Sequence, residues 1–249
     1  MKQASTPWPL PFWIAHRGAG RLAPENTLAA FRAGAGFGYR AFECDLKLSR
    51  DGVPFLLHDD DLDRTTSGRG PAGALDWSQL SRLDAGGWHS PHHAGEPVAS
   101  LEAVAAFLIA NHSAINIELK PNPGQARETG EVLGREVTRL WADQRLRPLF
   151  SSFQPEALEG VRSSAPAERR ALLLDKHRDS WLDEAQALGC CAVITNYRLM
   201  DRARIEAIHA AGMRALVYTV NDEATATRLR AQGLDGLITD AIDRLDPER

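Results

Sequence analysis

Short apolar runs alternate with segments of helical periodicity along most of this chain. The runs are typical of strands, and we place eight of them, at 12–15, 40–48, 114–119, 148–152, 171–174, 191–195, 214–220 and 235–239. Another run, at 53–57, follows an Asp51-Gly52 turn, so we expect it to form a hairpin with 40–48. Apolar residues between Leu101 and Leu108 recur with clear helical spacing.

Eight strands separated by helices are typical of the α/β class, and most of all of a (β/α)8 TIM barrel, which has a helix after each parallel strand. A doubly wound parallel sheet is the alternative, because periodicity does not show whether a sheet closes. The length of 249 residues allows one or two domains, and we expect a single barrel domain over 1–249.

The stretch 59–99 departs from this rhythm. It contains no long periodic segment, and glycine and proline recur throughout it. Loops between strands and helices usually have about 2–6 residues, so a connection of this length is typical of a functional loop or a small subdomain. We therefore expect a small insertion after strand two, over the C-terminal face of the barrel, where active sites lie in this fold.

Composition excludes several classes of protein. Hydrophobic residues make up 43% of the chain and charged residues 25%, as in ordinary globular proteins. The net charge of −4 argues against a broadly basic nucleic-acid binder. The apolar runs are too short to cross a membrane, and prolines interrupt the first residues where a signal peptide would be apolar. Three cysteines without a disulfide framework suit reduced thiols, so we expect a cytoplasmic protein with no membrane insertion.

Carboxylates gather at the ends of two early strands. Glu43 and Asp45 project to the same side, because side chains alternate along a strand, and Glu118 and Lys120 do the same on the next one. Three converging carboxylates repel one another, and oxygen ligands favour a hard divalent cation, Mg²⁺ or Ca²⁺. The alternative is that Glu43 and Asp45 form structural ion pairs with nearby cations, namely Lys47, Arg40 or Lys120.

Two histidines also follow early strands. His16 ends the first strand and His58 follows 53–57, and imidazoles titrate near neutral pH, so the two are candidates for a general acid and base. The alternative for either is a buried histidine that is only hydrogen-bonded. Arg17 has the forked geometry that suits a phosphate, and Lys120 is placed to neutralise developing charge. The histidines of WHSPHH, at 88–93, are typical either of a second metal site or of a solvated loop.

Taken together, these segments resemble the glycerophosphodiester phosphodiesterase family, most of all its bacterial cytosolic form. The resemblance keeps the family's order over nearly the whole chain. The matching stretches are AHRGAGRLAPENTLAAF (15–31), FECDLKLSRDGVPFLLHDDDLDRTTSGRG (42–70), NIELKP (116–121), SSFQPEAL (151–158), VYTVND (217–222) and DGLITD (235–240).

The resemblance implies a TIM barrel with an insertion at about 59–99 and a metal-dependent hydrolase. Its substrates would be small glycerophosphodiesters, such as glycerophosphocholine or glycerophosphoethanolamine, cleaved to sn-glycerol 3-phosphate and an alcohol. The implied roles are metal ligands Glu43, Asp45 and Glu118; acid and base His16 and His58; phosphate contacts Arg17 and Lys120; supporting residues Glu25 and Asn26; and glycerol-pocket walls Phe153 and Tyr218.

Several alternatives stay open at this point. The family often has WTVN where this chain has YTVN at 218–221, which puts substrate selection there in question. Asn26 is also typical of a plain helix cap. The attacking oxygen belongs either to water or to the neighbouring glycerol hydroxyl, and either histidine is a candidate for the base. The rival functions are a phosphodiesterase acting on membrane lipid and a non-catalytic binding barrel. No nucleic-acid partner is expected, and assembly into a homo-oligomer is left open.

Overall fold

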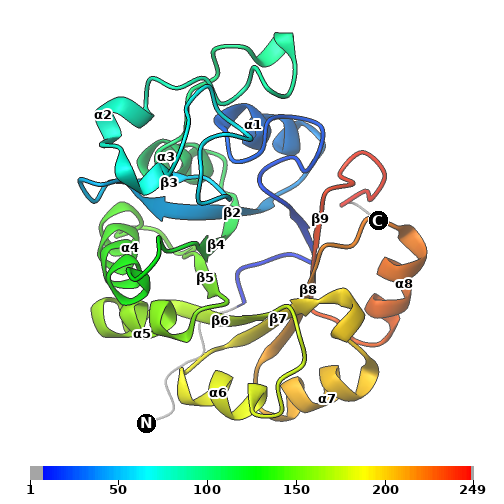
Figure 1. Ribbon diagram of the computed structural model, residues 1–249. Coiled ribbons are helices and arrows are strands. Elements are labelled where there is room, and N and C mark those ends of the chain that lie inside the picture. Colours follow the sequence, from blue (N-terminus) through cyan, green and yellow to red (C-terminus); the bar gives the residue numbers. More distant parts are fainter. Residues whose placement is uncertain (1–7, 248–249) are drawn as a thin grey trace.

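The computed structural model describes residues 8–247, and these form a closed barrel of parallel strands surrounded by helices (Figure 1). The prediction that the N-terminal segment is not a signal peptide involves the first seven residues, which lie outside the described residues. The strands are β1 (Trp13–Ala15), β2 (Ala41–Leu48), β3 (Pro54–Leu56), β4 (Ala114–Leu119), β5 (Leu149–Ser152), β6 (Arg169–Leu174), β7 (Ala192–Asn196), β8 (Arg214–Tyr218) and β9 (Gly236–Thr239).

The pairing of β1 closes the sheet. This strand is bonded to β9 on one side and to β2 on the other, where Ala15 pairs with Phe42. The expected TIM barrel is therefore confirmed, and the doubly wound alternative is excluded. The expected hairpin is also present, because β3 pairs antiparallel with β2 as an additional strand outside the parallel barrel.

The helices that surround the barrel are α1 (Leu28–Gly36), α3 (Leu101–Ala110), α4 (Ala126–Leu140), α5 (Pro155–Ser164), α6 (Trp181–Ala187), α7 (Arg202–Ala210) and α8 (Glu223–Ala231). The sequence pattern had not predicted α5. This helix begins at Pro155 and lies so close to α4 that a Cβ on Gly160 would be 2.2 Å from the carbonyl oxygen of Arg127. Gly160 occupies a buried position where most helices have an apolar side chain. The apolar periodicity of α5 is therefore weaker, which helps explain why the sequence did not reveal this helix.

The two faces of the strands form two apolar layers. One layer includes Phe42, Ile117 and Val193 and packs against the helices, whereas the other is a separate cluster of strand residues that includes Ala41, Ala114 and Leu149. The second layer therefore fills the barrel interior. Because side chains alternate, residues two and four positions after Ala41 and Ala114 point inward as well. This alternation carries charged residues into the C-terminal mouth of the barrel.

The segment predicted as an insertion, 59–99, connects β3 to α3 and lies at one end of the molecule (Figure 1). It contains η1 (Ala72–Ala74), α2 (Trp77–Leu80) and η2 (Pro91–His93), and a further short turn, η3 (Tyr197–Leu199), follows β7. Leu62, Leu80 and Val98 form a small core of their own with Phe55 of β3. We retain the extent of the insertion as a prediction. Within residues 8–247, no helix is both long and apolar enough to cross a lipid bilayer.

A close glycine contact seats the loop after β1 on α1. A Cβ on Gly34 would lie 2.2 Å from the carbonyl oxygen of Gly18, and Gly18 itself has a φ of +95°. Side chains at these positions would force the loop and the helix apart, since packed interiors have little room to adjust. The loop carries His16 and Arg17, so this contact places both residues relative to the barrel.

We expect Gly34→Ala to lower the free energy of unfolding by about 1–3 kcal/mol, because the added methyl group meets backbone. The matched control is Gly36→Ala in the same helix, where a Cβ would meet nothing within 4 Å, and its effect should stay within about 1 kcal/mol. Urea unfolding measures both variants. Equal stabilities of the two would contradict the proposed close contact.

Candidate active site

Three carboxylates converge at the C-terminal mouth of the barrel. Glu43 and Asp45 come from β2 and Glu118 from β4, where Asp45 and Glu118 are register partners. One oxygen from each lies within 4.8 Å of the others, and Glu43 and Asp45 are almost completely buried. Oε1 of Glu43 is buried and has no hydrogen-bond partner among the described residues. This orphaned oxygen, together with an all-oxygen donor set, fits a hard divalent cation.

The electrostatics of this triad are unbalanced. Burial raises the pKa of Glu43, and the charges of Asp45 and Glu118 raise it further. Burial and Asp45 likewise raise the pKa of Glu118, despite the nearby Lys120. The pKa of Asp45 is lowered, because Arg17 and neighbouring cations outweigh its burial. Fully ionised, the triad would carry more negative charge than the surrounding side chains neutralise, which is the charge that a bound cation would compensate.

The ion-pair alternative accounts for only part of the triad. Lys120 Nζ lies 2.9 Å from Glu118 Oε1 and 3.9 Å from Asp45 Oδ1. Lys47 instead pairs with Asp60, at 2.7 Å, and Arg40 donates to backbone carbonyls. None of the three predicted cations reaches Glu43 within salt-bridge distance in the described part of the chain.

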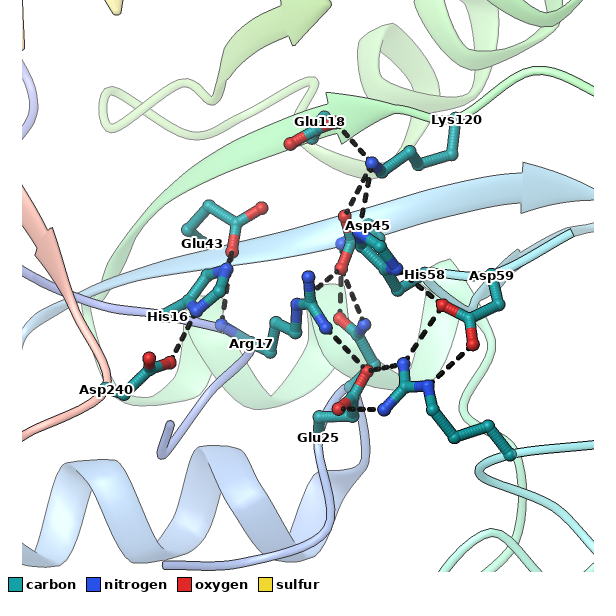
Figure 2. A network of polar contacts seen from close by, with 12 residues as sticks. His16, Arg17, Glu25, Glu43, Asp45, His58, Asp59, Glu118, Lys120 and Asp240 are labelled. Carbon is teal, nitrogen blue, oxygen red and sulfur yellow. Dashed lines mark hydrogen bonds and ion pairs between the residues drawn. The ribbon is translucent and has the colours of Figure 1, made fainter. Parts of the chain in front are cut away.

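Both candidate histidines are held by carboxylates through Nδ1. His16 Nδ1 lies 2.6 Å from Asp240 Oδ1, and His58 Nδ1 lies 2.6 Å from Asp59 Oδ1 (Figure 2). Each ring thus turns Nε2 towards the site: His16 Nε2 is 3.8 Å from Glu43 Oε2, and His58 Nε2 is 3.2 Å from the Lys120 ammonium. This is the arrangement in which a carboxylate fixes the tautomer and orientation of an imidazole.

The two histidines have pKa values shifted in opposite directions. Burial disfavours charge on His16, but the Asp240 hydrogen bond and the charge of Glu43 outweigh burial, so its pKa is raised. Burial lowers the pKa of His58, and the charge of Arg17 lowers it further. The charge of Asp45 acts in the opposite direction but does not outweigh these two effects. Titratable groups whose environments separate their pKa values are typical of an acid and base pair.

The sequence reasoning missed Asp240, which follows β9. Its carboxylate accepts from the Asn221 amide at 3.0 Å, and its own backbone N–H donates to Asn221 Oδ1 at 2.8 Å. Asp240 reaches His16 because barrel closure sets β9 beside β1. The residue lies in the motif DGLITD, yet only closure shows which histidine it meets. Asp59 was missed as well, although it directly follows His58.

The loop between β1 and α1 binds to the triad through backbone and side chains. The Arg17 N–H donates to Glu43 Oε2 at 3.1 Å, and its Nη1 donates to Glu25 Oε1 at 2.8 Å. Asn26 exchanges two hydrogen bonds with Asp45, whereas Thr27 is the cap of α1, so Asn26 is not a plain helix cap. Arg17 and Asn26 have positive φ angles of 50° and 60°. Such strained backbone is concentrated at functional sites.

Phe153 borders a cavity next to the triad, and Tyr218 packs against its ring. The rings of Phe153 and Tyr218 meet edge-on, with their centroids 5.8 Å apart, and Lys120 Nζ lies 5.7 Å from the centre of the Phe153 ring. The Tyr218 hydroxyl donates to the carbonyl of Leu174 at 3.2 Å. The cavity of about 330 Å³ is lined by His58, Lys120 and Phe153, among others. The site therefore has room for a small substrate beside His58 and Lys120.

The insertion provides no second metal site. Among the described residues, the only group with metal-binding geometry is the Glu43, Asp45 and Glu118 triad. His89 Nε2 instead donates to the carbonyl of Arg21. Of the two sequence interpretations of WHSPHH, the structure favours the loop without a metal.

The C-terminal mouth of this TIM barrel combines an acidic triad, two carboxylate-held histidines and a partly buried guanidinium. Such a combination is typical of enzymes that act on anionic substrates. Residues 16–244 match the model of the Glycerophosphoryl diester phosphodiesterase family. The chain belongs to this family, and it is a phosphoric diester hydrolase.

Individual relatives agree with this assignment. A Bacillus subtilis strain 168 relative, described as "Putative glycerophosphodiester phosphodiesterase YhdW", is 33% identical over 92% of this chain and 94% of the relative. A glycerophosphodiester phosphodiesterase of Caldanaerobacter subterraneus subsp. tengcongensis is 28% identical, over 94% of each chain. A solved structure of an Oleispira antarctica phosphodiesterase, in complex with the product sn-glycerol-3-phosphate, is 33% identical with a TM-score of 0.88, covering 94% of this chain and 95% of that one.

We expect Asp240→Asn to destabilise the enzyme in a pH-dependent way. Burial opposes charge on Asp240, but the hydrogen bond and charge of His16 lower its pKa to about 2. The unfolded value is about 3.9, so the stability that the carboxylate contributes is present above that pH and is lost as the pH falls towards 2. The variant should lose about 2 kcal/mol at pH 6 and about half as much at pH 3.

Urea unfolding at pH 6, 4 and 3 measures this difference. Asp179→Asn is the control, because the side chain of Asp179 is fully exposed, and it should change little at any of these values. A loss for Asp240→Asn that stays constant from pH 6 to pH 3 would refute the coupling between Asp240 and His16.

Proposed function

We propose that this enzyme hydrolyses small glycerophosphodiesters, such as glycerophosphocholine and glycerophosphoethanolamine, to sn-glycerol 3-phosphate and an alcohol. The observation that carries the proposal is the meeting of an acidic triad, two carboxylate-held histidines and Arg17 at one end of the barrel. The relative from Oleispira antarctica, with sn-glycerol-3-phosphate as its bound product, supports the same product for this chain.

The proposed metal ligands are Glu43, Asp45 and Glu118, and the proposed ion is Mg²⁺ or Ca²⁺, since all three donors are oxygens. Bound there, such an ion would supply Lewis-acid polarisation of the phosphodiester. Asn26 keeps one of these ligands in place through its two hydrogen bonds to Asp45.

Arg17 and Lys120 are the proposed phosphate contacts. Both cations border the triad, with Arg17 Nε 3.2 Å from Asp45 Oδ2 and Lys120 Nζ 2.9 Å from Glu118 Oε1. Fixed cations at this place stabilise the negative charge that gathers on the phosphoryl oxygens in the transition state. Glu25 holds the Arg17 guanidinium from the side away from the triad.

The opposite pKa shifts of the two histidines support opposite roles. His58, whose pKa is lowered, is the proposed base, which accepts the proton of the attacking oxygen at Nε2. His16, whose pKa is raised, is the proposed acid, which donates a proton from Nε2 to the departing alkoxide. The same two steps serve whether the attacking oxygen is that of water or that of the neighbouring glycerol hydroxyl.

Phe153 and Tyr218 are proposed to wall the glycerol part of the substrate. Phe153 lines the cavity, and the ring of Tyr218 packs edge-on against it, with the Tyr218 hydroxyl already engaged by the carbonyl of Leu174. The ring therefore presents apolar surface to the carbon atoms of glycerol.

We also propose that the enzyme works in the cytoplasm, because all three cysteines carry free thiols.

We expect the enzyme to release glycerol 3-phosphate from glycerophosphocholine and glycerophosphoethanolamine but not from intact phosphatidylcholine. EDTA should abolish this activity, and Mg²⁺ or Ca²⁺ should restore it, because the triad needs a cation to balance its charge. A coupled glycerol 3-phosphate assay measures all of these. Activity that resists EDTA would overturn the metal assignment, and preference for the intact lipid would overturn the substrate class.

His16→Ala and His58→Ala should each reduce kcat by about 10²–10⁴, because each removes a proton-transfer group. His92→Ala is the matched control, since His92 is an exposed histidine of the insertion, and it should stay within about twofold of the wild type. Steady-state kinetics on glycerophosphocholine checks the set. Near-normal turnover in either of the first two variants would remove that histidine from the mechanism.

A further inference from the structure

Arg64 lies between two carboxylates of the site. Its Nε donates to Asp59 Oδ2 at 2.6 Å, and its Nη2 donates to Asp59 Oδ1 at 3.1 Å. The same guanidinium donates to both oxygens of Glu25, at 2.9 Å from Nη1 and 2.8 Å from Nη2. One planar group thus binds two acids from different parts of the chain, a geometry that arginine provides and lysine does not.

Each of these acids holds one of the groups proposed to act on the substrate. Asp59 Oδ1 accepts from His58 Nδ1 at 2.6 Å, and Glu25 Oε1 accepts from Arg17 Nη1 at 2.8 Å (Figure 2). We infer that Arg64 is a positioning residue, which fixes His58 and Arg17 relative to each other without touching the triad. This inference rests on the roles proposed above for those two residues.

The insertion determines where Arg64 stands. Leu62 is fully buried in the small core of the insertion, and Thr65 and Thr66 are also buried. The Thr66 hydroxyl donates to the carbonyl of Leu62 at 2.8 Å, which fixes the turn that carries Arg64. The Arg64 guanidinium is therefore oriented from a backbone packed outside the barrel. Through it, the folding of the insertion is coupled to the geometry of the site.

The loss of Arg64 would leave two acids with fewer partners. Asp59 would keep only the imidazole of His58, and Glu25 only the guanidinium of Arg17, among the hydrogen bonds between described side chains. Both acids could then rotate and carry their partners with them. A displacement of about 1 Å in a positioned group can cost about 10² in rate, so the effect should appear in turnover.

The test is a double-mutant cycle on the full-length enzyme with glycerophosphocholine and the metal that supports activity. We expect Arg64→Met to lower kcat by about 10–100-fold, and Arg64→Lys to lower it less, because an ammonium keeps the charge but not the fork. In an Asp59→Asn, Glu25→Gln background, Arg64→Met should cost less than about threefold, since the groups through which it acts are already altered.

Arg69→Met is the matched control. Arg69 belongs to the same insertion and is mostly exposed, and among residues 8–247 its ion-pair partner is Asp63 alone. The kcat of Arg69→Met should therefore stay within about twofold of the wild type. A general folding defect would lower the activity of Arg64→Met equally in both backgrounds, and this additivity would overturn the inference. If Arg64→Met does not fold, Arg64→Lys takes its place in the same cycle.

The outcomes separate this inference from the proposed function. A wild-type enzyme that releases no glycerol 3-phosphate would overturn the proposed function, and the role of Arg64 with it. An active wild-type enzyme whose Arg64→Met variant matches Arg69→Met would overturn the role of Arg64 alone.

Discussion

The repulsion among three carboxylates inside one end of the barrel is the interaction on which the rest of the site depends. Glu43 and Asp45 are almost completely buried, and Glu118 completes the triad from the neighbouring strand. Isolated buried charges are too costly to persist unpaired, so protons, cations or metal ions must compensate them. Arg17 and Lys120 compensate part of this charge, and the raised pKa values of the two glutamates show that part remains.

A second set of carboxylates, outside the triad, orients the histidines and the arginine around it. Asp240 holds His16, Asp59 holds His58, and Glu25 holds Arg17. None of these three belongs to the triad, and each comes from a loop at the barrel mouth. The strands supply the acidic triad, whereas the loops at the C-terminal face supply the histidines, Arg17 and the acids that orient them.

The sequence revealed most of the site because alternation along a strand is a local rule. Spacing put Glu43 and Asp45 on one side of a strand, and the expected barrel put Glu118 on the next strand; the structure confirms that the three converge. Asp240 could not be matched to His16, since their contact depends on closure of the barrel between β9 and β1. Helix α5 was not assigned from the sequence, and the glycine at its close contact with α4 weakens the apolar pattern that would mark it.

The most direct test of this account is the number of protons released when Mg²⁺ or Ca²⁺ binds to the enzyme at pH 7. Titration calorimetry in two buffers of different ionisation enthalpy gives that number. If burial and the mutual repulsion of the carboxylates keep a proton on Glu43 or Glu118 until a cation replaces it, about one proton should leave per ion bound. Binding without proton release, or no binding at all, would contradict the claim that the triad is a site built for a divalent cation.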